Sequence, residues 1–155
     1  MFQELVEKGI AEQIKAVAID MNAGFASVAK QYLPNARIVY DLFHVMQHYG
    51  QDVLKPARQL CIRQLAQRKE LRDYKADRRL LRNVEWALLT PAEALKPDAK
   101  QRLEAIAKDN ELILSLLPLG DMVRSVWSAI SQQEACELLQ ECVELLETIA
   151  QKHNF

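Results

Sequence analysis

Residues 14–45 read IKAVAIDMNAGFASVAKQYLPNARIVYDLFHV, and this stretch decides the fold. Two short apolar runs, 14–20 and 36–41, each end in an aspartate, Asp20 and Asp41. The segment between them has apolar residues at helical spacing and stops before Pro34, which disfavours a helical residue in front of it. Two strands joined by a helix predict a right-handed βαβ unit with parallel strands. Both aspartates then lie at the carboxyl edge of the sheet, where open α/β sheets bind ligands and metals.

The rest of the chain is predicted to be helical, because apolar residues recur every three or four positions beyond Phe43. Residues 90–93 (TPAE) and the pair Ser131 and Glu134 are typical of helix starts. A further helix is expected over 98–117, ended by Pro118. A two-stranded parallel sheet is rarely stable alone. We therefore expect another copy of the chain, or strands of a longer protein, to complete it.

Bulk composition fits one globular domain of 155 residues, half of them apolar. No apolar run approaches the roughly 20 residues that span a bilayer, and no basic-then-apolar leader is seen, so we expect no membrane association. The three cysteines form no CxxC pair, which predicts reduced thiols in the cytoplasm. The motifs GxxxxGK[ST], GxSxG and HExxH do not occur, which removes the function classes that depend on them.

Charge is strongly separated along the chain although the net charge is only −1. Residues 55–82 hold ten basic and three acidic side chains, and residues 104–147 hold nine acidic and two basic ones. The basic segment could face a polyanion, pack against the acidic half or form a solvated surface. Trp86 and Trp127 fall in apolar helical patterns, so we expect core positions rather than base-stacking platforms. The candidate DNA contacts, with which nearby acids compete, are Lys55, Arg58, Arg63, Arg68, Lys69, Arg72 and Lys75.

Two groups of residues carry candidate chemistry. Asp20 could ligate Mg²⁺, or it could cap the helix that follows it. Asp41, His44 and His48 fall on one helix face and could bind a zinc-like metal. Alternatively, Asp41 is an N-cap with His44 bonded to it locally and His48 on a wet surface.

The run from Val17 to His48 resembles the DDE transposases of bacterial insertion sequences, in a class with a long helical insertion. Asp20 matches the second catalytic aspartate of that family, in its "vaiD(M)" strand. The family's next block, "lPnA-ivxDxFHv", matches LPNA at 33–36 and the Asp41-x-Phe43-His44-Val45 pattern. Leu42 departs from the pattern, because a basic residue is common there. Nothing before Asp20 matches the family's first aspartate, and its later glutamate motif is not reached, so the chain resembles an internal fragment.

The resemblance implies an α/β fragment of a ribonuclease-H-like core over 1–46, followed by an α-helical insertion over 47–155 and a predominantly helical chain overall. It implies Asp20 as the catalytic and metal-binding residue for Mg²⁺ or Mn²⁺, with Asp41 and His44 in accessory roles. The complete enzyme is expected to hydrolyse phosphodiesters and transfer strands at insertion-sequence ends, while the isolated chain is inactive. Expected partners are transposon-end DNA and further copies of the chain, in the bacterial cytoplasm at the nucleoid.

A non-enzymatic alternative stays open. A helical oligomerisation or regulatory module, derived from a truncated transposase, is also consistent with the long helical region and the separated charge. A small metalloprotein that uses Asp41, His44 and His48 is the third hypothesis.

Overall fold

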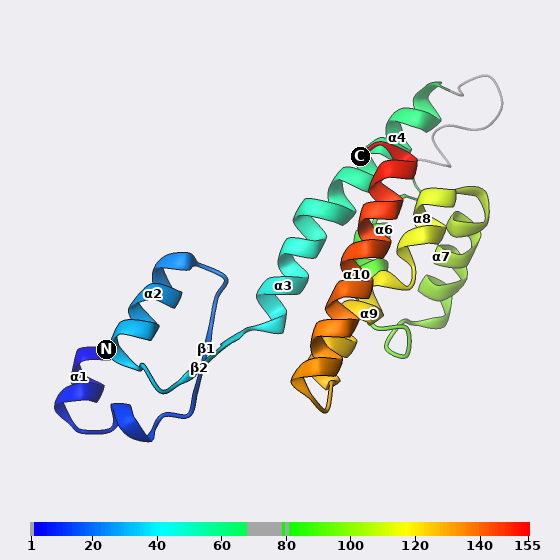
Figure 1. Ribbon diagram of the computed structural model, residues 1–155. Coiled ribbons are helices and arrows are strands. Elements are labelled where there is room, and N and C mark those ends of the chain that lie inside the picture. The colour runs from blue at the N-terminus through cyan, green and yellow to red at the C-terminus, as the bar shows by residue number, and fades with distance from the viewer. Residues whose placement is uncertain (1, 68–78, 80) are drawn as a thin grey trace. The chain divides into compact units, whose positions relative to one another are not determined.

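The computed structural model describes residues 2–67, 79 and 81–155, and it divides the chain into two compact units. Unit 1 covers residues 1–47 and unit 2 covers residues 48–155. In the described residues, one two-stranded parallel sheet accompanies a predominantly helical chain (Figure 1). The predicted fold class, a βαβ unit followed by a helical region, is therefore confirmed.

The elements follow one another in a simple order. The first are α1 (Phe2–Glu7), η1 (Ala11–Gln13), β1 (Ala16–Ile19), α2 (Ala23–Tyr32), β2 (Arg37–Tyr40) and α3 (Leu42–His48). The π-helical turn η2 (Tyr49–Leu54) and α4 (Lys55–Gln67) come next. The remaining described elements are α6 (Val84–Leu89), α7 (Pro97–Asp109), α8 (Glu111–Leu116), α9 (Leu119–Ser125), η3 (Val126–Ser128) and α10 (Gln132–His153).

The βαβ unit forms where the sequence predicts it. Strands β1 and β2 pair in parallel, with Val17 opposite Ile38 and Ile19 opposite Tyr40. Helix α2 begins at Asn22, whose side chain accepts a hydrogen bond of 2.8 Å from the Gly24 amide. Asparagine is a favoured N-cap because its oxygen satisfies an amide that the first turn leaves unpaired. The alternative in which Asp20 caps this helix is therefore wrong.

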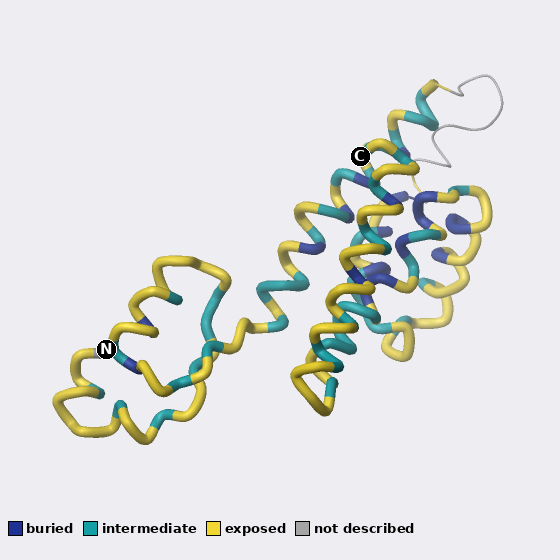
Figure 2. The backbone as a smooth tube through the Cα atoms, in the orientation of Figure 1, coloured by how far each residue is buried: buried dark blue, intermediate teal, exposed yellow. Residues whose placement is uncertain are grey.

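Unit 1 buries little of its apolar surface. Among the residues of unit 1 whose burial is described, Ala29 of α2 and Leu33 at its end are buried, and most of the tube around them is exposed (Figure 2). Val39 of β2 and Phe25 of α2 remain 44% and 56% exposed. Covering exposed apolar surface with a partner lowers the free energy by about 25 cal/mol for each Å² that is removed from water. This agrees with the expectation that a two-stranded sheet needs further covering surface.

Unit 2 has a well-packed helical core. Helix α10 packs on α8, α9 and η3, and α6 packs on η2, α4 and α7. The most deeply buried side chains of these helices include Leu54, Cys61, Val84, Leu112, Ile113, Leu116 and Leu119. Fully burying a leucine or isoleucine contributes roughly 1.5–3 kcal/mol, so this unit has the larger share of apolar stabilisation.

The turn before α4 is wide for a physical reason. The amide of Lys55 bonds to the carbonyl of Gly50, five residues back, as in a π-helix. Pro56 follows at once, and proline has no amide to donate and clashes with the carbonyl four residues before it. A π-helical turn displaces that carbonyl, so the helix continues through Pro56. The structure thus shows a widened turn at this proline.

Two helix boundaries differ from the sequence prediction. The predicted helix start at residues 90–93 is wrong: Thr90 Oγ1 donates to the Trp86 carbonyl at 2.7 Å and ends α6. The next helix starts at Pro97, a proline in the first turn. The helix predicted over 98–117 breaks at Asn110, which caps α8 by accepting from the Ile113 amide at 3.1 Å. The start at Ser131 is confirmed, because its hydroxyl accepts from the Glu134 amide at 3.1 Å.

Trp86 is not a core residue. Its side chain faces away from the buried positions of α6 and is 54% exposed, whereas Val84, Ala87 and Leu88 face inward. Trp127 is 38% exposed. The prediction of a core position for Trp86 is wrong, because the indole lies on the exposed side of a six-residue helix. Within the described residues, no helix combines the length and the apolar character that a bilayer crossing requires.

Candidate functional site

The candidate site lies at the carboxyl edge of the two-stranded sheet. The register places Ile19 opposite Tyr40, so Asp20 and Asp41 each follow the last residue of a strand. The Asp41 amide donates to the Ile19 carbonyl at 3.1 Å, which continues the ladder by one more bond. The two aspartates therefore end neighbouring strands at the same edge, as the sequence predicts.

The two aspartates have different local roles. Asp41 Oδ1 accepts a hydrogen bond of 3.0 Å from the Phe43 amide, so Asp41 is the N-cap of α3. Asp20 has no such role in its own helix, because Asn22 caps α2. The Asp20 carboxylate is thus free for another interaction at the edge, and its side chain is 43% exposed.

His44 lies closest to Asp20 rather than to Asp41. The distance from His44 Nδ1 to Asp20 Oδ1 is 3.8 Å, longer than a hydrogen bond but within the range of an ion pair when the imidazole is protonated. The ring of Phe43 meets the imidazole edge-on, with the ring centres 5.5 Å apart. Sequence spacing grouped His44 with Asp41, and it could not show that a helix turn brings the imidazole across to the other strand's aspartate.

The described residues do not build a complete metal site. No group of three or more histidine, cysteine, aspartate or glutamate side chains converges in the part of the chain that the structure describes. His48, the third residue of the alternative zinc-like site, has its Nδ1 3.0 Å from Asp52 Oδ2. An i, i+4 pair of this kind engages His48 within its own helix. The structure therefore gives no support to the small-metalloprotein hypothesis.

The predicted DNA contacts are only partly described. Lys55 and Arg63 are exposed on α4, whereas Arg58 is engaged inside unit 2. Arg58 Nε donates to the Leu81 carbonyl at 3.0 Å, and Arg58 Nη1 lies 3.3 Å from Glu85 Oε1. The guanidinium thus ties α4 to α6. Four of the predicted contacts lie outside the described residues, namely Arg68, Lys69, Arg72 and Lys75.

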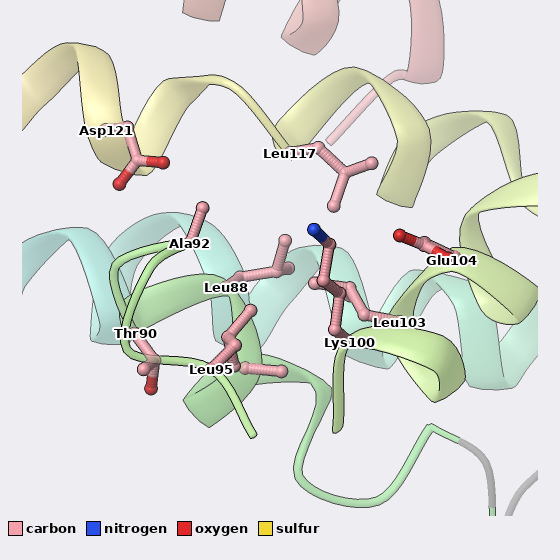
Figure 3. Close-up of a pocket in the computed structure, with 10 residues that line it drawn as sticks. Leu88, Thr90, Ala92, Leu95, Lys100, Leu103, Glu104, Leu117 and Asp121 are labelled. Atoms are coloured by element: carbon pink, nitrogen blue, oxygen red, sulfur yellow. The ribbon is translucent and has the colours of Figure 1, made fainter. Parts of the chain in front are cut away.

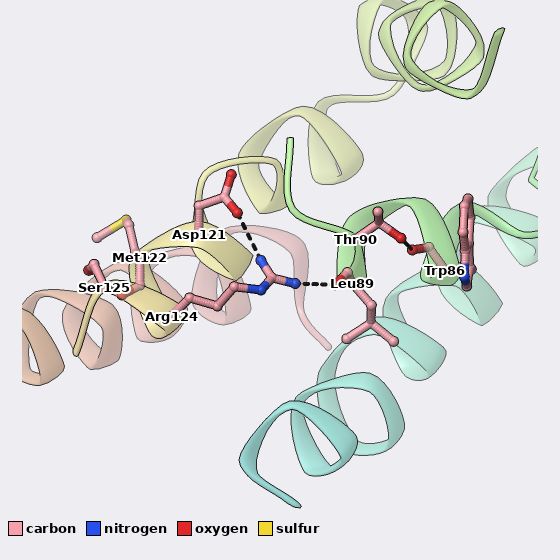
Figure 4. Close-up of polar contacts among 7 residues, drawn as sticks. All are labelled: Trp86, Leu89, Thr90, Asp121, Met122, Arg124 and Ser125. Atoms are coloured by element: carbon pink, nitrogen blue, oxygen red, sulfur yellow. Dashed lines mark hydrogen bonds and ion pairs between the residues drawn. The ribbon is translucent and has the colours of Figure 1, made fainter. Parts of the chain in front are cut away.

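Arg124 holds together two helices of unit 2, a role that the sequence did not indicate. Its Nη1 lies 2.8 Å from Asp121 Oδ1, and its Nη2 donates to the Leu89 carbonyl at the end of α6 (Figure 4). Only 19% of the Arg124 side chain is exposed. A largely covered cation with an acid and a carbonyl as partners supports packing of α9 on α6, because a helix leaves its last carbonyls unpaired. Burial raises the pKa of the nearby Tyr49 hydroxyl above its ordinary value.

A small apolar pocket lies beside these contacts. It encloses about 180 Å³ and is lined mainly by Leu88, Leu95, Leu103 and Leu117, with Lys100 and Glu104 also in its lining (Figure 3). Ligand sites of small molecules usually exceed about 300 Å³ and combine an apolar lining with convergent polar groups. This pocket is smaller, so we do not assign it a ligand.

Comparison with known proteins settles the family. The model of one DDE transposase family, the ISL3 type, described as "Transposase", matches residues 1–153. The chain belongs to this transposase family. It is also 33% identical, over 126 residues, to the "Transposase for insertion sequence element IS1001" of Bordetella parapertussis. The predicted resemblance is confirmed.

The match covers the two proteins unequally. It includes 81% of this chain but 30% of the Bordetella transposase, so this transposase segment spans about a third of its relative. No solved structure matches the chain significantly.

Proposed function

We propose that this chain supplies part of the catalytic core of a DNA transposase that hydrolyses phosphodiesters and transfers strands at insertion-sequence ends. The observation that carries the proposal is the position of Asp20, which follows a parallel strand and is not used as a helix cap. In a transposase family member, a carboxylate at this edge is suited to bind a metal ion at the reacting phosphate. Unit 1 is then a part of a ribonuclease-H-like core and unit 2 a helical insertion.

Asp20 fits one position of a Mg²⁺ or Mn²⁺ site, since hard cations of this kind take carboxylate oxygens. In the part of the chain that the structure describes, no group of three or more such side chains gathers around Asp20, so these residues do not form a complete site by themselves. We propose that the other ligands come from the remaining two thirds of the complete transposase. The metal would there stabilise the charge of the attacking and leaving oxygens.

His44 and Asp41 support this edge without touching the reacting atoms. Asp41 fixes the first turn of α3, and that turn carries His44 to within 3.8 Å of Asp20. The imidazole lies beside the Asp20 carboxylate and occupies part of the space around it. We therefore assign both residues to positioning.

The DNA substrate and the location follow from the same proposal. The ends of an insertion element in bacterial DNA are the expected partner, and the bacterial cytoplasm at the nucleoid is the expected place of action. Lys55 and Arg63 of α4 are exposed and available for phosphate contacts. Arg58 stays a predicted contact, although its guanidinium already has partners within unit 2.

The isolated 155-residue chain is expected to bind Mg²⁺ with a Kd above about 1 mM and to show no strand transfer, because one carboxylate cannot hold the ion against its hydration shell. Isothermal titration with MgCl₂ and MnCl₂, together with a strand-transfer assay on labelled transposon-end DNA, measures both properties. Asp20→Asn serves as the control for any binding at the sheet edge. If the purified chain shows strand transfer and Asp20→Asn abolishes it, the proposal that the other metal ligands come from outside this chain would be contradicted.

A second candidate function is self-association through α10. Cys136, Leu139 and Val143 lie at i, i+3 and i+7 of this helix and are exposed, the last two by 52% and 48%. An apolar stripe at this spacing is suited to a second helix. This observation favours a homo-oligomer, in agreement with the sequence prediction.

The double variant Leu139→Lys, Val143→Lys is expected to weaken self-association at least about tenfold, since each side chain buried in an interface contributes roughly 1.5–3 kcal/mol. Light scattering coupled to size exclusion, over a range of protein concentrations, measures the molar mass. The matched control is Glu137→Lys, Thr148→Lys, which adds the same side chains at exposed positions away from the stripe. A monomer at all concentrations in the unmodified chain would remove this candidate.

A further inference from the structure

A second concave surface of unit 2 carries a distinct charge pattern. It encloses about 350 Å³ between α6 and the start of α7. Its lining includes four cations, one acid and a tryptophan: Arg79, Arg82, Lys96, Arg102, Asp98 and Trp86. We call this surface the Trp86 groove. Its volume lies at the lower end of the roughly 300–1,000 Å³ of small-ligand sites, large enough for one group the size of a base with its sugar.

Three of the four cations of the Trp86 groove have no ion-pair partner among the described residues. Among the residues that the structure describes, no salt bridge involves Arg82, Lys96 or Arg102. Arg102 Nε donates to the backbone carbonyl of Asp98 at 3.2 Å, which orients the side chain through a neutral acceptor. Arg58 and Arg124 elsewhere in unit 2 both have acidic partners. Like charges gathered in one concave surface repel each other, so they favour an external anion.

The tryptophan gives the groove an aromatic wall. Trp86 is 54% exposed although Val84, Ala87 and Leu88 of the same helix are buried. Its backbone is fixed, because its carbonyl accepts from both the amide and the hydroxyl of Thr90, at 3.0 and 2.7 Å (Figure 4). An exposed indole on a fixed turn, beside several cations, is the combination with which proteins hold the bases and phosphates of single strands.

We propose that the Trp86 groove binds single-stranded DNA, with one unpaired base stacked on Trp86 and neighbouring phosphates at Arg82, Lys96 and Arg102. A paired base in a duplex presents only its edges, so it cannot reach the face of the indole. An acidic peptide would use the cations but gain little from the aromatic wall. The proposal rests on the proposed function, because it assigns to the helical unit a contact with DNA strands that strand transfer exposes.

The direct test is fluorescence anisotropy of the 155-residue chain with a labelled 12-nucleotide single strand and with the duplex of the same sequence. Trp86→Ala is expected to weaken single-strand binding about 5- to 150-fold, the range for losing one stacked base, and to leave duplex binding unchanged. Trp86→Phe keeps an aromatic face and is expected to restore most of the affinity. Because Trp86 is half exposed, neither change removes a core residue.

The arginines are tested by salt dependence. For single strands the slope of log Kobs against log salt is about −0.7 for each phosphate contact, so Arg82→Ala, Arg102→Ala should make it shallower by about 1.4. Lys108→Ala removes an exposed cation from α7 outside the groove and serves as the matched control, with an unchanged slope expected.

Tryptophan emission locates the bound base. The chain has two tryptophans, so Trp127→Phe leaves Trp86 as its single indole. Adding the unlabelled single strand is expected to quench this emission, whereas Trp86→Phe, which retains only Trp127, is expected to show no quenching. Equal quenching in both variants would place the DNA elsewhere.

The outcomes separate the two proposals. Suppose that the chain binds the duplex as tightly as the single strand and that Trp86 emission is not quenched. This result would overturn single-strand binding at the Trp86 groove and leave the transposase proposal intact. Preferential, Trp86-independent binding of a poly-glutamate peptide would overturn it in favour of a protein partner. If Asp20→Asn leaves strand transfer by the complete transposase unchanged while the chain still binds single strands, only the catalytic proposal would be overturned.

Discussion

In a complete transposase that carries this segment, Asp20→Asn is expected to lower the rate of strand transfer by about three orders of magnitude or more. The change keeps the shape of the side chain and removes the charge that would hold a metal ion at the sheet edge. Three orders of magnitude correspond to about 4 kcal/mol of lost transition-state stabilisation. Single-turnover assays on pre-cleaved transposon-end DNA measure the chemical step separately from binding.

Asp41→Asn is the matched control for this prediction. Asparagine caps helices as well as aspartate does, so the bond from the Phe43 amide is retained and only the charge is lost. We expect strand transfer to stay within about tenfold of the unmodified enzyme. An equal loss in both variants would show that both aspartates are catalytic and that the division of roles at this edge is wrong.

Gly120→Val is expected to destabilise unit 2 by about 2–4 kcal/mol. A Cβ atom at this position would lie 2.8 Å from the Leu88 carbonyl oxygen and 3.8 Å from the Tyr49 ring. The first neighbour is backbone, so it cannot move aside without displacing α6. Gly120→Ala meets the same oxygen, but its better helix propensity offsets about 1 kcal/mol of the cost.

Tryptophan fluorescence during urea unfolding measures this effect, because both tryptophans, Trp86 and Trp127, lie in unit 2. Gly50→Ala is the matched control. Its Cβ would meet the Leu89 side chain at 3.1 Å, and the end of a flexible leucine can give by a few tenths of an ångström. We expect a change of less than about 1 kcal/mol for this control. A Gly120→Val protein as stable as the unmodified chain would show that α6 and α9 pack less tightly than described.

Local sequence signals were sufficient for the βαβ unit. The apolar runs before Asp20 and Asp41 are short and bounded by a helix signal and Pro34, so strand and helix could be told apart. The helix boundaries at Thr90 and Asn110 could not be told from sequence, because each has two competing roles. A threonine can cap the next helix or bond back to the previous one, and only packing selects between them.

The sequence pointed to Asp20, Asp41 and His44 as candidate residues, but it did not predict that His44 lies beside Asp20. Sequence spacing places Asp41 and His44 on one turn, and the cap at Asp41 was among the alternatives. The approach of His44 to Asp20 depends on the register of two strands and the direction in which α3 leaves the second one. The Trp86 groove is lined by residues of two helices that a loop separates in the sequence. The apolar periodicity within one helix therefore cannot predict this surface.

The two-stranded sheet has a practical consequence for the segment as a reagent. Among the described residues the sheet has two strands, so each of them is an edge strand. Open edges of this kind template pairing between molecules. We therefore expect concentrated solutions of the segment to associate through these edges, and we expect the segment to accept a further strand from another chain in split-protein complementation.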